Sequence, residues 1–157
     1  MEVIALLRSG KMQPTLVDIS EYKIIGIGNI GKPTHPGDVW PALFTRINEV
    51  TDRINHHETI GLIKRNEPGY LAGVRTESLS EVPEGMFMYK IPAGQYAGVT
   101  HRGPISKINE SFEKLIYWLS TNNYEEFDVV CIEIYDERFK GEEDDSELDM
   151  FIQLKPI

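Results

Sequence analysis

The sequence predicts an α+β protein built from two copies of one strand-helix-strand-strand unit. Three observations predict this class: two segments with helical periodicity, several short segments rich in β-branched residues, and the return of the same element order in the second half. The chain has 157 residues, which is the size of one domain, so both copies would share a single sheet. We expect a mainly antiparallel sheet with both helices on one face and the other face free for function.

The first copy contains four expected strands, because an additional strand precedes the strand-helix-strand-strand unit. Thr15–Ile19 and Tyr22–Gly28 are rich in Val, Ile and Leu and are separated by a short polar turn. Thr59–Ile63 and Tyr70–Thr76 flank a segment with Asn, Pro and Gly, which is typical of a turn. A helix is expected to connect the two pairs.

That helix is expected to begin at Asp38, whose carboxylate can accept hydrogen bonds from the first helical turn. Glycine and proline keep the preceding residues, Asn29 to Gly37, out of regular structure. The apolar residues of the helix recur every three to four positions and form one stripe: Trp40, Leu43, Phe44, Ile47, Val50 and Ile54.

The second copy repeats this order. Its strands are expected at Phe87–Ile91, Gln95–His101, Asp128–Asp136 and Asp149–Lys155. Its helix has the apolar stripe Ile105, Ile108, Phe112, Leu115, Ile116 and Leu119. The two halves then span about residues 13–77 and 86–157, and residues 1–12 form an N-terminal extension, because Met12 resembles a natural start.

Composition and charge exclude several functions. The formal charge of −9 and the scattered basic residues argue against direct nucleic-acid binding and favour cationic ligands. The longest apolar stretches, Val3–Leu7 and Val129–Ile132, are far shorter than the ~20 residues of a membrane helix. With no signal-peptide pattern, we expect a cytoplasmic protein that is not bound to membranes. The single cysteine, Cys131, is expected to be buried and inert.

Motifs for cofactors and metals are weak. Gly26–Gly31 matches the dinucleotide pattern GxGxxG, but the helix that should start within the glycine turn is postponed. The adjacent residues His56, His57 and Glu58 point in different directions and cannot form one metal face. The acidic run Glu142–Asp149 lacks the spacing of a calcium loop and is expected to be a solvated connection. We predict no cofactor and no metal.

Glu133 is the informative residue. In the strand Asp128–Asp136, alternation places Cys131, Glu133 and Tyr135 on one face, opposite Ile132 and its apolar neighbours. A carboxylate in so apolar a strand costs free energy unless it is solvated, paired or reserved for a ligand. Alternation alone leaves open whether this face is a wet strand or a binding site.

Seven short motifs, taken together, carry a resemblance to a known family. They are YKIIG at Tyr22–Gly26, WPALF at Trp40–Phe44, IPAGQY at Ile91–Tyr96, HRGP at His101–Pro104, Trp118-Leu119, EIYD at Glu133–Asp136 and IQLK at Ile152–Lys155. In order and spacing, the chain from about Gln13 onward resembles the gyrase-inhibitor-like (GyrI-like) small-molecule-binding family. The same domain is the effector-binding domain of AraC-type and MerR-type transcription activators.

The resemblance implies a fold and a site. The fold is a duplicated unit with approximate two-fold symmetry and a ligand groove between the halves. A glutamate at the position of Glu133 would face the positive charge of the ligand. The aromatic residues expected around it are Trp40, Phe44, Tyr96, Trp118 and Tyr135.

The resemblance also implies a function. We expect a free-standing binder of apolar or cationic small molecules that senses or sequesters its ligand, and the sequence alone does not separate such a binder from a hydrolase. We see no room for a helix-turn-helix segment before Gln13 or after Ile157, so we do not expect promoter regulation by this chain alone. Two alternatives stay open: a protein-interaction module that modulates DNA gyrase, and a hydrolase of reactive cyclopropane-type toxins. In the hydrolase, Glu133 and Tyr135 would be the catalytic pair.

Overall fold

The computed structural model describes residues 13–29, 32, 34–64, 68–77 and 81–156. The expected extension at residues 1–12 lies outside this part. The strands are β1 Thr15–Ile19, β2 Tyr22–Gly28, β3 Thr59–Lys64, β4 Leu71–Thr76, β5 Phe87–Ile91, β6 Gly94–Arg102, β7 Val129–Tyr135 and β8 Glu147–Gln153. The helices are α2 Pro36–Arg46 and α3 Ile108–Thr121, with short 3-10 turns at Ile47–Glu49 and Ile105–Lys107. The predicted α+β class and element order are confirmed.

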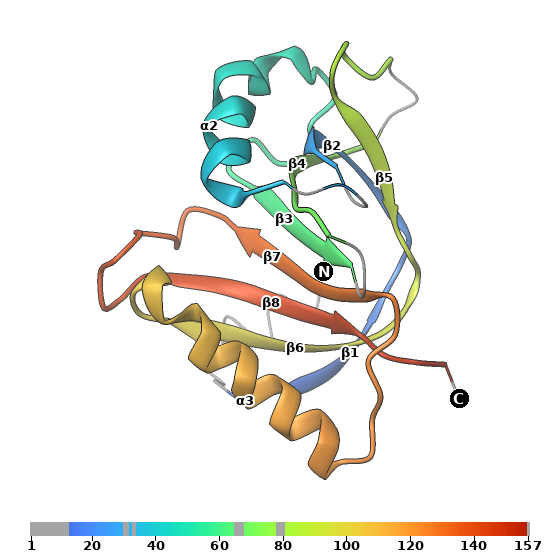
Figure 1. The fold of residues 1–157 in the computed structure, drawn as a ribbon, viewed down its shortest axis with the longest axis vertical. Coiled ribbons are helices and arrows are strands. Elements are labelled where there is room, and N and C mark those ends of the chain that lie inside the picture. The colour runs from blue at the N-terminus through green and yellow to red at the C-terminus, as the bar shows by residue number, and fades with distance from the viewer. Residues whose placement is uncertain (1–12, 30–31, 33, 65–67, 78–80, 157) are drawn as a thin grey trace.

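All eight strands join one antiparallel sheet in the order β1-β6-β8-β7-β3-β4-β2-β5. The order is symmetric about the central β7–β3 pair, and the sheet curls so that its two ends approach each other (Figure 1). The first strand of each half pairs with the other half, because β1 pairs with β6 and β5 pairs with β2. Each half therefore completes the sheet of the other.

The helices cover one face of the sheet, as expected. On α3, Leu115 and Leu119 pack with β6 and β8, and on α2, Val39 and Leu43 pack with the start of β4. Each such fully buried side chain stabilises the fold by about 1.5–3 kcal/mol.

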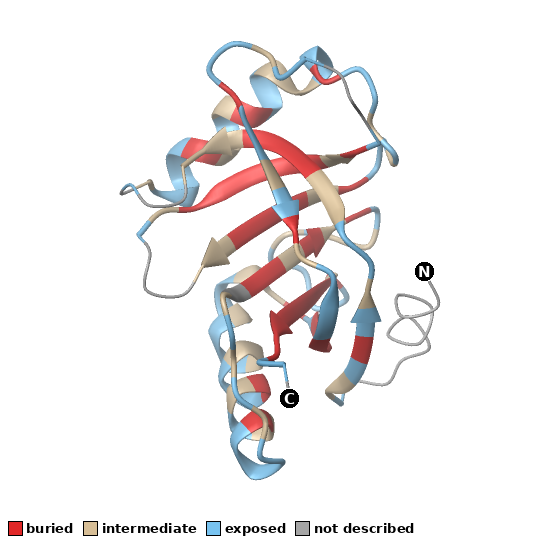
Figure 2. Ribbon diagram, turned by 90° about the vertical axis from the view of Figure 1, so that its right-hand side faces the viewer, coloured by how far each residue is buried: buried red, intermediate tan, exposed pale blue. Residues whose placement is uncertain are grey.

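The opposite face is not free, so that expectation is wrong. The curl of the sheet folds this face onto itself and closes a core to which both halves contribute (Figure 2). Its buried residues include Ile24, Ile60, Leu62, Leu71, Tyr96, Ile132, Ile134 and Phe151. Any site must therefore lie on the helix-bearing face or at the sheet edges.

Two local expectations are corrected. The first helix begins at Pro36 rather than at Asp38, because the Nδ1 atom of His35 accepts the hydrogen bond of Gly37 N at 3.0 Å and caps the helix. Proline suits the first helical position, where its missing N–H is not needed. The acidic run is not wholly a solvated connection, since β8 begins at Glu147 and Asp149 is completely buried.

None of the described helices is long and apolar enough to cross a membrane. Among the described residues, no three His, Cys, Asp or Glu side chains come close enough to hold a metal ion.

Candidate ligand-binding site

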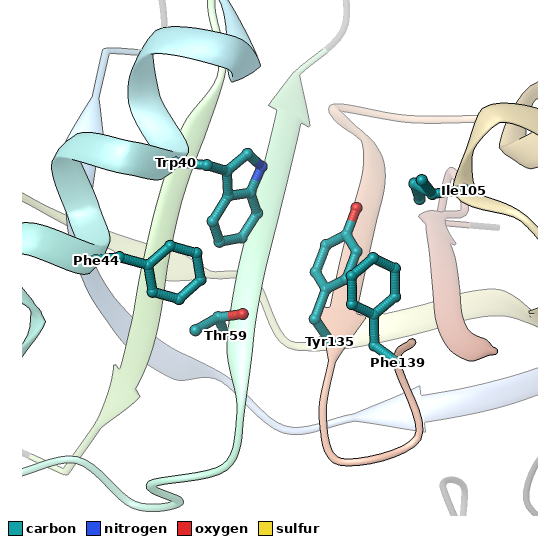
Figure 3. A pocket seen from close by; sticks show the side chains of 6 residues that line it. All are labelled: Trp40, Phe44, Thr59, Ile105, Tyr135 and Phe139. Carbon is teal, nitrogen blue, oxygen red and sulfur yellow. The ribbon is translucent and has the colours of Figure 1, made fainter. Parts of the chain in front are cut away.

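The candidate site lies on the helix-bearing face, over the two central strands. Helix α2 packs against β2 and β4, and α3 packs against β6. Strands β3 and β7 therefore run between the two helices, and the side chains that they direct toward this face line the space between the halves (Figure 3). Glu133 on β7 is one of these side chains, directly opposite Gly61 on β3.

Glu133 is held by a chain of three aromatic side chains. Its Oε1 atom accepts hydrogen bonds from the hydroxyl of Tyr70 at 2.5 Å and from the hydroxyl of Tyr135 at 3.1 Å. The Tyr70 hydroxyl in turn accepts a hydrogen bond from Nε1 of Trp40 at 3.2 Å. The carboxylate is thus tied to α2, to the start of β4 and to its own strand.

Gly61 makes room for this arrangement. A Cβ atom at this position would collide with the Tyr70 hydroxyl and lie 2.6 Å from Oε1 of Glu133. The carboxylate and the phenol therefore occupy the space that any other residue at this position would need. A glycine inside a predicted strand is the sequence signal for such a close approach.

Burial shifts the acid-base properties of the three groups. It raises the pKa of Glu133 above the ordinary value, while the hydrogen bonds from Tyr70 and Tyr135 oppose the shift. Burial also raises the pKa of both tyrosines, and the nearby Glu133 carboxylate raises it further. The two hydroxyls therefore stay protonated and donate, and the carboxylate is the group that can titrate.

An apolar cavity of about 220 Å³ lies beside this carboxylate, lined by Trp40, Phe44, Thr59, Ile105, Tyr135 and Phe139. Four of the six are aromatic and contact one another: the ring centroids are 5.8 Å apart for Trp40–Phe44, 5.3 Å for Trp40–Tyr135 and 4.8 Å for Tyr135–Phe139. Glu133 does not itself line the cavity. It lies behind Tyr135, whose ring forms the wall and whose hydroxyl binds the carboxylate.

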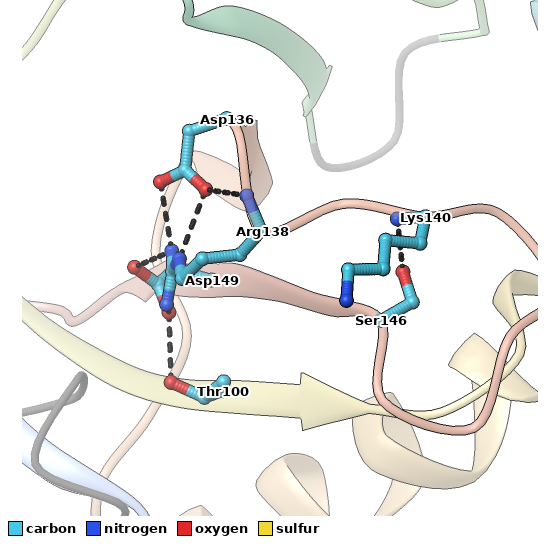
Figure 4. Close-up of polar contacts among 6 residues, drawn as sticks. All are labelled: Thr100, Asp136, Arg138, Lys140, Ser146 and Asp149. Atoms are coloured by element: carbon cyan, nitrogen blue, oxygen red, sulfur yellow. Dashed lines mark hydrogen bonds and ion pairs between the residues drawn. The ribbon is translucent and has the colours of Figure 1, made fainter.

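A buried ion network fixes the wall that carries Phe139. The guanidinium of Arg138 binds both oxygens of Asp136 at 2.9 Å and binds Asp149 at 2.8 Å, and Asp149 also accepts from Thr100 at 2.7 Å (Figure 4). Burial opposes the charge on Arg138, but its bonds to the two aspartates raise its pKa. This network fixes the turn after β7. The Phe139 ring in this turn packs against the Tyr135 ring.

The structure brings four of the six predicted site residues together: Glu133, Trp40, Phe44 and Tyr135. It places the other two elsewhere. Tyr96 is fully buried in the core on the opposite face, where its hydroxyl donates to the carbonyl oxygen of Pro92 at 2.8 Å. Trp118 lies on α3 and stacks on Tyr124, with ring centroids 5.7 Å apart.

Several residues of the site were missed from the sequence: Thr59, Gly61, Tyr70, Ile105 and Phe139. Tyr70 precedes its strand, and it meets Glu133 only through the pairing of three strands, β4, β3 and β7. Phe139 lies in a turn, where no periodicity indicates its direction. Gly61 alone had a usable signal, as a glycine within a strand.

The model of one protein family, the GyrI-like small molecule binding domain, matches residues 12–155. The chain belongs to this family. The match covers both halves, so the symmetric sheet and the site between the helices are parts of one GyrI-like domain.

A curated relative is the Transcriptional regulator BrlR of Pseudomonas aeruginosa, which is 28% identical over 163 residues. The alignment covers 98% of this chain but only 60% of BrlR. The chain thus spans less than two thirds of the length of that regulator.

Solved structures share the fold at low sequence identity. SAV2435 bound to tetraphenylphosphonium has a TM-score of 0.72 at 11% identity, and the match covers 92% of this chain and 94% of that one. The EcmrR–DNA complex also has a TM-score of 0.72, at 13% identity, over 99% of this chain and 64% of that one. A hydrolase from Listeria innocua has a TM-score of 0.58 at 9% identity, over 92% of this chain and 93% of that one.

Proposed function

We propose that this GyrI-like domain binds lipophilic organic cations in the aromatic cavity and that Glu133 provides the compensating negative charge. The observation that carries the proposal is the aromatic wall backed by a carboxylate: Tyr135 lines the cavity and donates to Glu133. The described contacts of Glu133 include no cationic side chain, so a bound cation would be its counter-charge.

The energetics favour a cation over a neutral compound. Each aromatic face attracts a desolvated cation by about 0.5–2 kcal/mol. The charge of Glu133 adds to this attraction, because a buried carboxylate is poorly screened by solvent. A neutral ligand of the same shape gains the apolar contacts only.

The cavity volume indicates the size of the ligand. About 220 Å³ accommodates a compact cation with one aromatic ring. A larger cation would extend beyond this volume past Phe44, which lines the cavity and is more than half exposed. The relative SAV2435, which has the same fold, is described with the larger cation tetraphenylphosphonium, and this supports the ligand class.

A binder fits the site better than a hydrolase does. Glu133 does not line the cavity, and the Tyr135 ring that donates to its Oε1 atom forms the cavity wall in front of it. A hydrolase needs a carboxylate that can reach a water molecule beside the substrate.

The biological role that we propose is ligand sensing or sequestration in the cytoplasm, without direct contact between this domain and nucleic acid. The relative BrlR is named a transcriptional regulator, which supports a sensing role for a domain of this family. The basic residues of this chain are scattered and its formal charge is −9, which disfavours phosphate binding.

Two measurements test the proposal. Native mass spectrometry of the protein purified from its own cells should detect a small cationic compound bound to the chain. Isothermal titration calorimetry should show tighter binding of phenyltrimethylammonium than of tert-butylbenzene, which has the same shape with carbon in place of the charged nitrogen. Equal affinity for the two compounds would contradict the proposal.

A further inference from the structure

Thr59 differs from the other five residues that line the cavity, because it is the only one among them that is neither aromatic nor aliphatic. It lies at the start of β3 directly opposite Tyr135, and its side chain lies at the cavity between Phe44 and Tyr135 (Figure 3). Within the part of the chain that the structure describes, its hydroxyl makes no hydrogen bond to the protein. The hydroxyl therefore has its donor and acceptors available to a ligand.

The position of Thr59 relative to Glu133 is fixed by the strand register. Thr59 pairs with Tyr135, and Gly61 pairs with Glu133, so Thr59 and Glu133 are diagonal neighbours on the same face. Diagonal cross-strand neighbours lie about 7–8 Å apart. The negative charge of Glu133 thus lies behind the Tyr135 wall of the cavity, and the hydroxyl of Thr59 lies at the cavity between Phe44 and Tyr135.

We propose that Thr59 determines specificity, and that the ligand is an aromatic cation that also carries a hydroxyl or another hydrogen-bonding group on its ring. The inference rests on the proposed function and adds a second point of recognition. In a mostly apolar cavity, a few polar groups fix the orientation of the ligand. A ligand without such a group would bury the Thr59 hydroxyl without a partner, and this costs free energy.

The test compares phenyltrimethylammonium with its three ring-hydroxylated isomers. At least one isomer should bind the wild-type chain about 3- to 10-fold more tightly than the parent cation, which is the size of one net hydrogen bond. Thr59→Val keeps the shape of the side chain and its preference for a strand but removes the hydroxyl. In this variant the hydroxylated isomer should no longer bind more tightly than the parent cation. The affinity for the parent cation itself should not fall.

Thr45→Val is the matched control. Thr45 lies on α2, is exposed, and donates to the carbonyl oxygen of Pro41 at 2.9 Å, outside the cavity. The control should retain the gain of the isomer, and thermal unfolding should show that both variants are folded.

The inference is overturned if no isomer gains affinity, or if the gain persists in Thr59→Val, or if Thr45→Val loses it equally. Neutral tert-butylphenols separate this inference from the proposed function. If they bind in a Thr59-dependent way while phenyltrimethylammonium does not bind at all, Thr59 is a recognition residue and the cation proposal is wrong. If none of these compounds binds, both are wrong.

Discussion

Tyr70 connects the charged group of the site to its aromatic wall, since its hydroxyl donates to Glu133 and accepts from Trp40. The hydroxyl lowers the pKa of Glu133 and so opposes the effect of burial. Cation binding needs the ionised carboxylate, so affinity should rise as the pH rises through the pKa of Glu133.

Tyr70→Phe should move this rise in affinity to higher pH. Without the hydroxyl, burial acts on Glu133 with less opposition, so the carboxylate ionises later. Titration of phenyltrimethylammonium into both proteins between pH 4 and 9 measures the shift. Tyr96→Phe removes a buried hydroxyl on the opposite face and should leave the midpoint unchanged. A shift toward lower pH in Tyr70→Phe would contradict the account.

Gly61→Ala should damage both the fold and the site. The added methyl group would collide with the Tyr70 hydroxyl and crowd Oε1 of Glu133, so one of the two must move. Such overpacking costs about 1–3 kcal/mol. Urea denaturation measures the loss of stability, and calorimetry measures the loss of cation binding. A variant with unchanged stability and unchanged affinity would show that the close packing around Gly61 is unimportant.

Alternation within one strand predicted that Glu133 and Tyr135 share a face, and the family resemblance predicted that this face belongs to the site. The sequence did not identify Tyr70, because that contact depends on which strands pair. It placed Tyr96 and Trp118 in the site from family resemblance alone, whereas Tyr96 belongs to the opposite face of its strand and Trp118 belongs to the distant end of α3.

At the scale of elements, the turn between β7 and β8 supports one wall of the cavity. Arg138 forms ion pairs with the buried carboxylates of Asp136 and Asp149, whose side chains are 3% and 0% exposed. Farther along the turn, the carbonyl oxygen of Gly141 accepts from Ile105 N at 3.0 Å, which fixes Ile105 beside Phe139. The wall therefore depends on a turn whose role its sequence did not reveal.

Arg138→Met should destabilise the fold strongly. The substitution removes the guanidinium that binds the buried carboxylates of Asp136 and Asp149, and the loss of one partner in such a network costs about 3–5 kcal/mol. Lys140→Met is the control in the same turn, because Lys140 forms an exposed ion pair with Asp145 and should barely affect stability. Thermal unfolding of the two variants measures the difference. Similar melting temperatures would mean that the Arg138 network does not hold the turn.

The element boundaries show what periodicity can and cannot predict. Strands were predicted to within a few residues because they are short, apolar and bounded by turns. The start of α2 was missed because His35 caps the helix and Pro36 opens it, a combination that the preference for Asp at N-caps does not indicate. The exchange of β1 and β5 between the halves depends on long-range pairing and leaves no local signal.

At the scale of the whole molecule, the exchanged strands and the shared core make the two halves one cooperative unit. Ile24, Leu62 and Leu71 of the first half pack in the same core as Ile132, Ile134 and Phe151 of the second. The halves should therefore unfold together, in a single two-state transition.

The two tryptophans test this, because Trp40 reports on the first half and Trp118 on the second. Trp118→Phe leaves only Trp40 as a tryptophan, and Trp40→Phe leaves only Trp118. In each variant, the tryptophan fluorescence and the far-UV circular dichroism should change at the same urea concentration. A fluorescence transition that precedes the dichroism transition in either variant would show that the halves unfold separately.

The charge of Glu133 is the central claim, and one substitution tests it most directly. Glu133→Gln retains the size of the side chain and an oxygen that can accept from both tyrosines, but it removes the charge. Glu113→Gln, on the exposed side of α3, also removes one negative charge and serves as the control.

Calorimetry at neutral pH with phenyltrimethylammonium and tert-butylbenzene gives the decisive comparison among the wild type and these two variants. We predict that Glu133→Gln weakens binding of the cation about tenfold or more and leaves binding of the neutral isostere unchanged. Glu113→Gln should leave the binding of both compounds unchanged. An equal loss for both compounds, or no loss for the cation, would contradict the role of Glu133 as the charge that selects the ligand.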